Sequence, residues 1–383
     1  MRVGLLTNNV MPPREGIGRH VLEIAKRLPA RGVEPLIVAR GHGLRWQSLE
    51  VEGVPVRLFP YLPVRPLHQE ALRLVLQRWL DHGAEGCTTL HLHLPLLPPL
   101  RTPLRRVVTF HSPLLSDTAA IAEPGLKAAL IKANARLVSQ AYEHAHIRNA
   151  AALVAVSTNV QDELARHYRL LGRRVDVIGN GVDTGVFTYR GGPRPADAEG
   201  RRSVLYVGRL GYRKGLHRLL DAFACLGDGR LRLELAGEGP LREKLAAQAR
   251  DLGIAERVRF LGFLETPALL AALQRAAVFV NPADYESGPL TLLEAMAAGT
   301  PVVTTATGLA TDLAAGPDRQ RPCVMAERTP LDLATAIAGV LADPEAATAM
   351  AERARRLVLE RFTWDEVVRR LVARYGHIER LAA

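Results

Sequence analysis

Two glutamates separated by seven residues, Glu286 and Glu294, are the side chains of this sequence whose types and spacing suggest chemistry most directly. A short apolar run at 278–280 precedes the first glutamate and predicts a buried strand, and residues 290–298 have helical composition. A second apolar run at 302–305 predicts the next strand of a parallel sheet. Ligands bind such sheets at the carboxyl ends of the strands, where helix N-termini attract phosphate. Carboxylates at this place would suit a sugar and a ribose, because they accept hydrogen bonds from paired hydroxyls.

The segment that carries both glutamates resembles the signature of family 4 glycosyltransferases, which have the GT-B fold. The resemblance rests on Glu286, Glu294 and the run AMAAGTPVV, in which Gly299 has a C-cap position and Pro301 ends the helix. Taken singly, each glutamate could be an ordinary surface or helix-end acid. The resemblance implies that Glu286 holds hydroxyls of the transferred sugar and that Glu294 holds the ribose. It also implies that the backbone after Glu286 contacts the donor, at Ser287, Gly288 and Leu290.

Two cations, Arg209 and Lys214, follow a predicted strand at 203–207 in a glycine-rich loop. Cations at such a loop can neutralise a leaving diphosphate. The chain has 5 lysines and 45 arginines, so a lysine in this loop is unusual for the composition. The alternative is that Arg209 and Lys214 are ordinary surface residues without a role in binding. The run VGRL…KG is similar to the diphosphate-binding motif of the family. Gly237, in LAGEGP, matches a further family loop beside the base and the ribose, or serves backbone shape alone.

The N-terminal segment predicts a strand at 2–7, a glycine-rich loop and a helix over 18–30. Its G-x-G-x-H spacing is not a dinucleotide-binding fingerprint, which needs G-x-G-x-x-G. The loop is similar to the first loop of the family, PxxxGGIxRH, with Glu15 where the first glycine of the pair commonly falls. Gly16 is therefore the candidate for close approach to the donor phosphate or the acceptor, and a glycine needed only for the turn is the alternative.

His111 follows a predicted strand at 106–110, at the end where an open sheet presents groups to a ligand. The run VVTFHS resembles the strand-end histidine of the family, which lies near the transferred sugar and the acceptor. His91 and His93 alternate on a predicted strand and suggest a metal pair. Neither an acid nor a cysteine accompanies them, so no metal site is expected.

Alternating strands and helices predict an α/β protein with parallel sheets in both halves. By the resemblance, the architecture is GT-B, with two Rossmann-like, doubly wound domains facing a central cleft. We expect an acceptor-binding domain at 1–183, a linker at 184–202 and a nucleotide-sugar-binding domain at 203–361. A C-terminal helix at 362–383 would cross back to the first domain.

The composition, with 48% hydrophobic and 23% charged residues, is that of a soluble globular protein. The net charge of +11 is uneven, because residues 1–190 hold 24 Lys and Arg against 15 Asp and Glu. A basic half could face nucleic acid, an anionic membrane or a phosphate-bearing acceptor, or be a general solvated surface. The N-terminus has no long apolar core, so we expect a cytoplasmic protein, with possible contact at the inner face of the membrane.

A predicted helix over 67–82 carries Leu72, Val75, Leu76, Trp79 and Leu80 on one face, with Arg65 and Arg78 flanking this stripe. The stripe would suit a membrane surface that presents a lipid-linked acceptor. An ordinary helix that covers the sheet is the favoured interpretation.

The resemblance implies a metal-independent, retaining transfer of a hexosyl group without a cofactor. The donor would be a UDP- or GDP-sugar, and the acceptor a glycan, a lipid-linked molecule or a small molecule. The residues expected at the reacting atoms are His111, Glu286, Arg209 and Lys214. A nucleotide-sugar 2-epimerase on the same architecture is the alternative. A nucleic-acid binder is disfavoured because aromatic residues make up only 5% of the chain and no recognised module is present.

Overall fold

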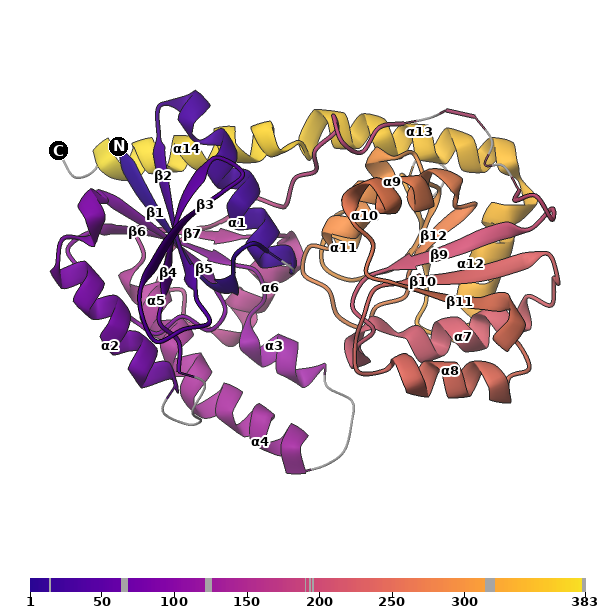
Figure 1. Cartoon of the computed structure of the whole chain (residues 1–383), viewed down its shortest axis with the longest axis horizontal. Coiled ribbons are helices and arrows are strands. Elements are labelled where there is room, and N and C mark those ends of the chain that lie inside the picture. The colour runs from indigo at the N-terminus through magenta and orange to yellow at the C-terminus, as the bar shows by residue number, and fades with distance from the viewer. Residues whose placement is uncertain are drawn as a thin grey trace. The chain divides into compact units, whose positions relative to one another are not determined.

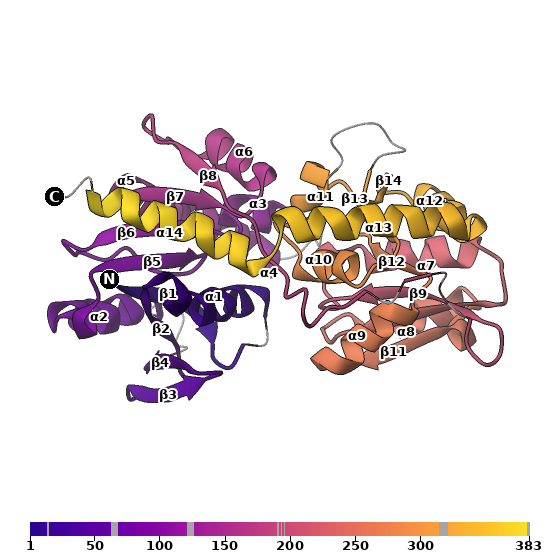
Figure 2. The ribbon, with the colours of Figure 1, turned by 90° about the horizontal axis from the view of Figure 1, so that it is seen from above.

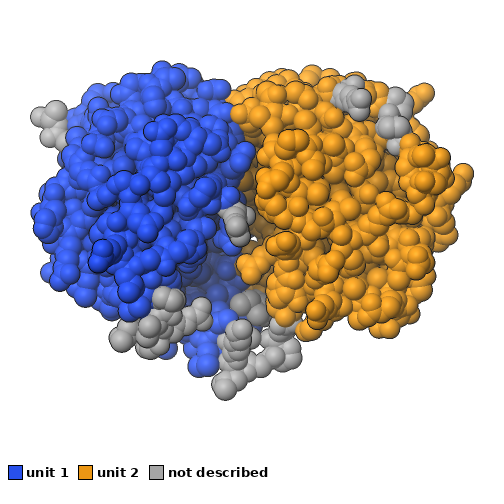
Figure 3. Space-filling model, in the orientation of Figure 1, with its two compact units in different colours: residues 1–119, 124–181, 364–383 blue, residues 120–123, 182–363 orange. Residues whose placement is uncertain are grey.

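The computed structural model describes the chain except residues 14, 63–67, 121–125, 190, 193, 195, 314–320 and 381–383. Two compact units divide the chain (Figure 3). Unit 1 contains residues 1–119, 124–181 and 364–383, and unit 2 contains residues 120–123 and 182–363. The chain therefore leaves unit 1, forms unit 2 and returns to unit 1 with its last helix.

The described part of unit 1 is built on an eight-stranded sheet with the order β3-β4-β2-β1-β5-β6-β7-β8 (Figure 1). The strands are β1 (Arg2–Val10), β2 (Glu34–Arg40), β3 (Gln47–Val51), β4 (Val54–Phe59), β5 (Thr89–Leu94), β6 (Arg105–Phe110), β7 (Ala152–Ala155) and β8 (Val175–Val177). Neighbouring strands pair in parallel, apart from β3 and β4.

The sheet is parallel as expected apart from one edge, where β3 runs antiparallel to β4. Only Glu52 and Gly53 connect the two strands, and both have positive φ, 49° and 80°. A two-residue turn of this kind favours a hairpin because its twist matches that of the flanking strands. A crossover to a parallel strand needs a far longer connection, so the short link decides the direction of β3.

Helices cover both faces of the unit 1 sheet. They are α1 (Gly16–Arg27), α2 (His68–Asp81), α3 (Leu114–Ala119), α4 (Leu126–Asn134), α5 (Gln140–Asn149), α6 (Thr158–His167) and α14 (Trp364–Arg380). α1 and α14 pack against each other (Figure 2), whereas α2, α5 and α6 share one apolar cluster with the sheet. A π-helical turn, Ala135–Ser139, separates α4 from α5.

α2 covers the sheet, as the favoured interpretation of its apolar stripe predicts. Leu72, Leu76 and Trp79 are buried in the core of unit 1. The stripe is therefore occupied by packing and is not free to meet a membrane. Arg65, expected to flank it, lies outside the described residues. Among the described residues, no helix combines the length and the apolarity needed to cross a membrane.

The described part of unit 2 has a six-stranded parallel sheet with the order β11-β10-β9-β12-β13-β14. The strands are β9 (Arg202–Val207), β10 (Leu231–Ala236), β11 (Val258–Gly262), β12 (Val278–Asn281), β13 (Val302–Thr305) and β14 (Val324–Ala326). The helices are α7 (Leu216–Cys225), α8 (Arg242–Asp251), α9 (Thr266–Arg275), α10 (Leu290–Ala297), α11 (Leu309–Leu313), α12 (Pro330–Ala342) and α13 (Pro344–Arg361). One apolar cluster joins the sheet to α7, α8 and α12, and another joins it to α9, α10 and α13.

The strand order reverses once in each unit, and each reversal marks a place for ligand-binding residues in its own unit. In unit 1, β1 is followed by β2 on one side and lies beside β5 on the other. In unit 2, β9 is followed by β10 on one side and lies beside β12 on the other. Loops leave the sheet in opposite directions at such a reversal, which opens a crevice at the carboxyl ends of the two strands. Ligand-binding residues are therefore expected after β1 and β5, and after β9 and β12.

Candidate active site

The loops after β9 and β12 of unit 2 pack backbone against backbone. The first loop ends in a short 3₁₀ turn, Tyr212–Lys214, and then at Gly215, which has φ +62°. A Cβ atom on Gly215 would lie 2.0 Å from the carbonyl oxygen of Pro282 in the second loop. The backbone N–H of Asp284 donates to the carbonyl oxygen of Arg213 over 2.8 Å. The two loops therefore form one supported surface at the reversal of the sheet.

This surface brings two of the sequence-predicted site residues into direct contact. The ammonium group of Lys214 forms an ion pair with the carboxylate of Glu286. Their side chains are 24% and 17% exposed, so each still reaches solvent. A second ion pair joins Arg218 to Asp284 over 2.6 Å, immediately beside the first. The arrangement holds a cation and a carboxylate together at the carboxyl ends of β9 and β12.

Two arginines add positive charge to the same loop. The side chain of Arg209 is exposed and has no ion-pair partner within the described part of the chain, while its carbonyl oxygen accepts from the Tyr206 hydroxyl over 3.0 Å. Arg213 is partly buried, and burial lowers the pKa of its guanidinium although Glu286 acts in the opposite direction. Sequence reasoning missed Arg213, which adjoins Lys214 in the same loop.

The Glu286–Gly288 segment is held by the loop after β13. Gly308 has φ +51°, and a Cβ atom there would lie 2.3 Å from the carbonyl oxygen of Glu286 and 2.4 Å from that of Ser287. The N–H of Leu309 donates to the Ser287 carbonyl oxygen over 3.1 Å. Only glycine allows this approach, so Gly308 fixes the position of the backbone next to Glu286.

α10 begins directly after this segment. Pro289 has the N-cap position and provides no side-chain cap, so the first N–H groups of the helix, beginning at Leu290, have no capping side chain. Glu294 lies half-buried in the fifth position of the helix, and Gly299, with φ +67°, ends it as predicted. The helix therefore presents its N-terminus beside the ion pair of Lys214 and Glu286.

Gly237 follows β10 and has φ +130°. A Cβ atom on it would lie 2.0 Å from the carbonyl oxygen of Gly208, whose N–H donates to the Ala236 carbonyl oxygen over 2.9 Å. The backbone alone thus requires glycine at this position. A role in contacting the donor stays a prediction.

In unit 1, α1 begins at Gly16, two residues earlier than expected. Glu15 has the N-cap position but provides no side-chain cap, and its carboxylate accepts from the Asn9 side-chain amide over 3.3 Å. Gly16 is exposed at this helix N-terminus. The tight packing in the loop is at Gly18, where a Cβ atom would lie 2.9 Å from the Cβ of Pro13.

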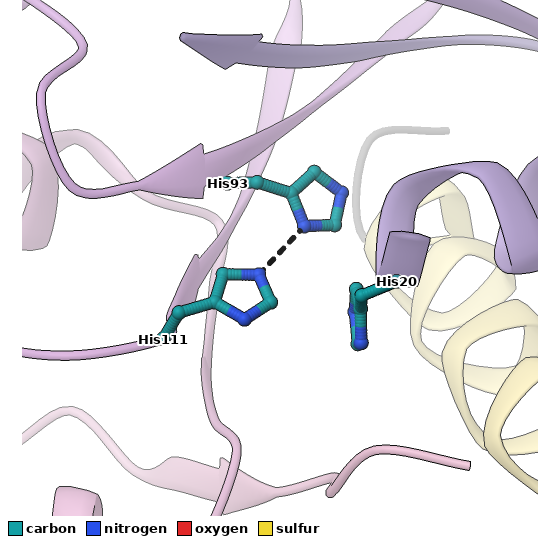
Figure 4. Close-up of side chains that lie close together, drawn as sticks. All are labelled: His20, His93 and His111. Atoms are coloured by element: carbon teal, nitrogen blue, oxygen red, sulfur yellow. Dashed lines mark hydrogen bonds between the residues drawn. The ribbon is translucent and has the colours of Figure 1, made fainter. Parts of the chain in front are cut away.

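His111 follows β6, and the structure gathers two further histidines around it (Figure 4). His93, near the end of β5, places its Nδ1 3.2 Å from Nε2 of His111. His20, on α1, has its ring centroid 4.6 Å from that of His111. All three side chains are buried, and His111 is 6% exposed. They meet because β5 and β6 are neighbours in parallel register and α1 follows the adjacent strand β1.

The surroundings orient these rings. Nδ1 of His20 donates to the side-chain oxygen of Asn180 over 2.7 Å, because an amide oxygen can only accept. His91 lies behind His93, with ring centroids 4.1 Å apart, and shares 2.7 Å hydrogen bonds with the hydroxyls of Tyr375 and Thr109. Sequence reasoning noted His91 and His93 as an alternating pair but missed His20, which no local pattern connects to them.

Burial keeps the histidines neutral. It lowers the pKa of His20 to about 4 and that of His91 to about 3, and it lowers the pKa values of His93 and His111 well below 6.5. Neighbouring imidazoles add to the effect for all but His20. His111 is therefore an uncharged hydrogen-bonding group near pH 7.

Known proteins share both the sequence patterns and the fold. A family model described as Glycosyltransferase Family 4 matches residues 14–186, and one described as Glycosyl transferases group 1 matches residues 193–357. A GDP-mannose-dependent alpha-mannosyltransferase of Mycolicibacterium smegmatis is 31% identical over 98% of this chain and 97% of its own length. The structure of a sucrose-phosphate synthase from Thermosynechococcus elongatus superposes with a TM-score of 0.83 and 21% identity over 99% of both chains.

The glycogen synthase of Mycobacterium tuberculosis is 37% identical over 58% of this chain. The chain spans about half of the length, 53%, of that curated relative. The likeness to the mannosyltransferase nevertheless extends over both units, and the structural likeness shows the GT-B fold predicted from the sequence. The chain belongs to glycosyltransferase family 4, the group 1 glycosyl transferases.

Proposed function

We propose that this chain is a retaining glycosyltransferase that moves a hexosyl group from a nucleotide-diphospho-sugar to an acceptor hydroxyl. The donor is a UDP- or GDP-sugar, and the acceptor is a glycan, a lipid-linked molecule or a small molecule. Family membership supports transfer, and the name of the full-length relative, a GDP-mannose-dependent enzyme, supports a nucleotide-sugar donor. These relatives do not favour the 2-epimerase.

One observation supports this proposal above the others. Arg209, Arg213 and Lys214 gather at the reversal of the unit 2 sheet, beside Glu286 and the N-terminus of α10. Breaking the bond between a sugar and a diphosphate leaves negative charge on the phosphate oxygens. Fixed cations and helix amides at that place stabilise the charge as it develops, without reorganisation of solvent.

The carboxylates have a complementary task in this proposal. Glu286 accepts hydrogen bonds from hydroxyls of the sugar, and Glu294 accepts from the ribose. Because Lys214 pairs with Glu286, binding of the donor would place the ammonium group between a carboxylate and a phosphate. A cation shared in this way aligns the sugar with its leaving group, which lowers the entropic cost of reaching the transition state.

The reaction keeps the anomeric configuration and needs no metal ion in this proposal. The oxygen of the acceptor forms a bond to the anomeric carbon on the face from which the diphosphate leaves. The proton of the acceptor hydroxyl passes to a leaving phosphate oxygen. His111 contributes hydrogen bonds to the sugar or the acceptor, since burial keeps its imidazole neutral.

A thermal-shift screen across UDP-, GDP- and ADP-sugars identifies the donor, because a ligand that binds only the folded state raises the melting temperature. Incubation of the selected donor with candidate acceptors should release the nucleoside diphosphate only when an acceptor is present. NMR of the product should show the anomeric configuration of the donor, and EDTA should not lower the rate. Acceptor-independent conversion of the donor into an epimer would instead contradict the transferase.

A further inference from the structure

Three imidazoles of unit 1 form a cluster with the composition of a metal site. His20, His93 and His111 each offer a ring nitrogen, and these nitrogens lie within 4.8 Å of one another. The three residues come from α1, from β5 and from the residue after β6, and their rings converge on one space (Figure 4). The sequence analysis paired His93 with His91, whereas the structure replaces His91 by His20 and His111, so that three ring nitrogens are available as ligands.

The spacing of the closest pair fits a tetrahedral ion. With zinc–nitrogen bonds of about 2.0–2.1 Å, two imidazole nitrogens on one edge of a tetrahedron lie about 3.3 Å apart. Nδ1 of His93 and Nε2 of His111 are 3.2 Å apart. The same distance therefore suits a hydrogen bond in the free protein and two ligands of one metal ion. Neither β5 nor β6 has to move for this pair to bind the ion.

His20 makes the supporting contact that metal-binding histidines commonly use. A ligating imidazole commonly donates its other N–H to a carbonyl or carboxylate, which fixes the orientation of the ring. His20 donates from Nδ1 to the side-chain oxygen of Asn180, and its lone pair is therefore on Nε2, where it can bind a metal ion. His91 holds the ring of His93 from behind and is itself held by Tyr375 and Thr109. Three neutral imidazoles are suitable zinc ligands because no proton has to be displaced from a cation.

We propose that His20, His93 and His111 bind one zinc ion, with water as the fourth ligand, and that the bound ion inhibits glycosyl transfer. The inhibition rests on the proposed function, in which His111 donates or accepts hydrogen bonds at the sugar or the acceptor. Zinc bound to the His111 nitrogen would block these hydrogen bonds and add positive charge there. When zinc binds, the proton of the hydrogen bond between His93 Nδ1 and His111 Nε2 is displaced to the other nitrogen of the imidazole that carries it. His93 Nε2 has no hydrogen-bond partner among the described residues and can carry it.

Zinc retention tests the site without any assay of activity. Tag-free protein is stripped with EDTA, incubated with zinc chloride, desalted and subjected to elemental analysis. The wild type should retain about one zinc ion per chain, and cobalt should give the visible absorption of a tetrahedral site. His93→Gln and His20→Gln should abolish both signals, whereas the matched control His144→Gln should keep them, since His144 lies outside the cluster on α5.

Asn180→Ala tests the supporting contact, and should weaken zinc binding about 10–100-fold while circular dichroism confirms folding. Equal zinc retention by the wild type and His93→Gln would overturn the site and leave the contact of His93 with His111 as a hydrogen bond only. Once a donor is known, zinc should inhibit transfer and EDTA should restore it. Zinc binding without inhibition would overturn the regulatory part. Failure to find any transfer would contradict the proposed function while the zinc stoichiometry still decides the site.

Discussion

Replacement of Lys214 by glutamine tests the assignment of the leaving-group site most directly. The change removes the ammonium charge and leaves Glu286 without its ion-pair partner. Removal of one fixed donor from a developing anion costs about 2.7–4 kcal/mol, or about 100- to 1,000-fold in kcat. Because the Lys214 side chain is 24% exposed, water screens part of its charge, and we expect a value near the lower limit. The predicted loss in kcat is therefore about 100-fold.

The loss should appear in kcat more than in KM, because charge on the diphosphate grows only as the bond to the sugar breaks. Steady-state release of the nucleoside diphosphate at saturating donor measures it. Lys26→Gln is the matched control, since Lys26 lies in the last turn of α1 in unit 1 and also forms an ion pair, with Glu52 over 2.6 Å. Its kcat should stay within about twofold of the wild type.

Urea denaturation must accompany the kinetics, because loss of the ion pair should also lower the free energy of unfolding by about 1 kcal/mol. The reasoning is refuted by a folded Lys214→Gln protein with a kcat within about threefold of the wild type. An increase in KM alone would also refute it, because Lys214 would then contribute to uniform donor binding rather than to stabilisation of the transition state.

Three further predictions address other parts of the chain. Glu294→Ala should weaken the affinity for the nucleoside diphosphate, measured by calorimetry, more than it lowers kcat. The reason is that the ribose hydroxyls are bound equally in the ground state and in the transition state. Gly308→Ala should lower donor affinity several-fold, measured in the same titration, because its Cβ would displace the Glu286 backbone. Burial raises the pKa of Glu143 from 4.5 to about 7, so its stabilising contribution is complete below pH 4.5 and is lost as the pH rises through 7. Relative to Glu143→Gln, urea denaturation of the wild type should show a loss of about 3 kcal/mol between these limits.

Much of unit 2 could be predicted from the sequence because its signals are local. The apolar run before Glu286, the helical composition around Glu294 and the glycine at 299 give the order strand, loop, helix and strand, as observed in β12, α10 and β13. In unit 1, the hairpin of β3 and β4 was missed because its turn, Glu52–Gly53, contains only one strong turn residue. Local sequence propensity predicts whether a segment is a helix or a strand. It does not predict that β3 pairs with β4, because this pairing depends on the two residues that link them.

The contacts that build the candidate site could not be predicted in the same way. Lys214 and Glu286 are 72 residues apart, and β10 and β11 lie between them in the sequence. They meet because β12 pairs with β9 on the side opposite to β10. The resemblance to the family assigned the two residues to different parts of the substrate, and only the strand order shows that they contact each other.

The two clusters differ in a way that constrains the chemistry. The residues at the reversal of unit 2 are charged and reach solvent, whereas the histidines at the reversal of unit 1 are buried and neutral. A neutral imidazole cannot compensate the charge of a leaving diphosphate, but it can orient a hydroxyl without attracting the phosphate to itself. The proposed function therefore assigns the stabilisation of charge to the cations of unit 2. For this reason a change at Lys214 should affect the leaving group, whereas a zinc ion on His111 would act on the sugar or the acceptor.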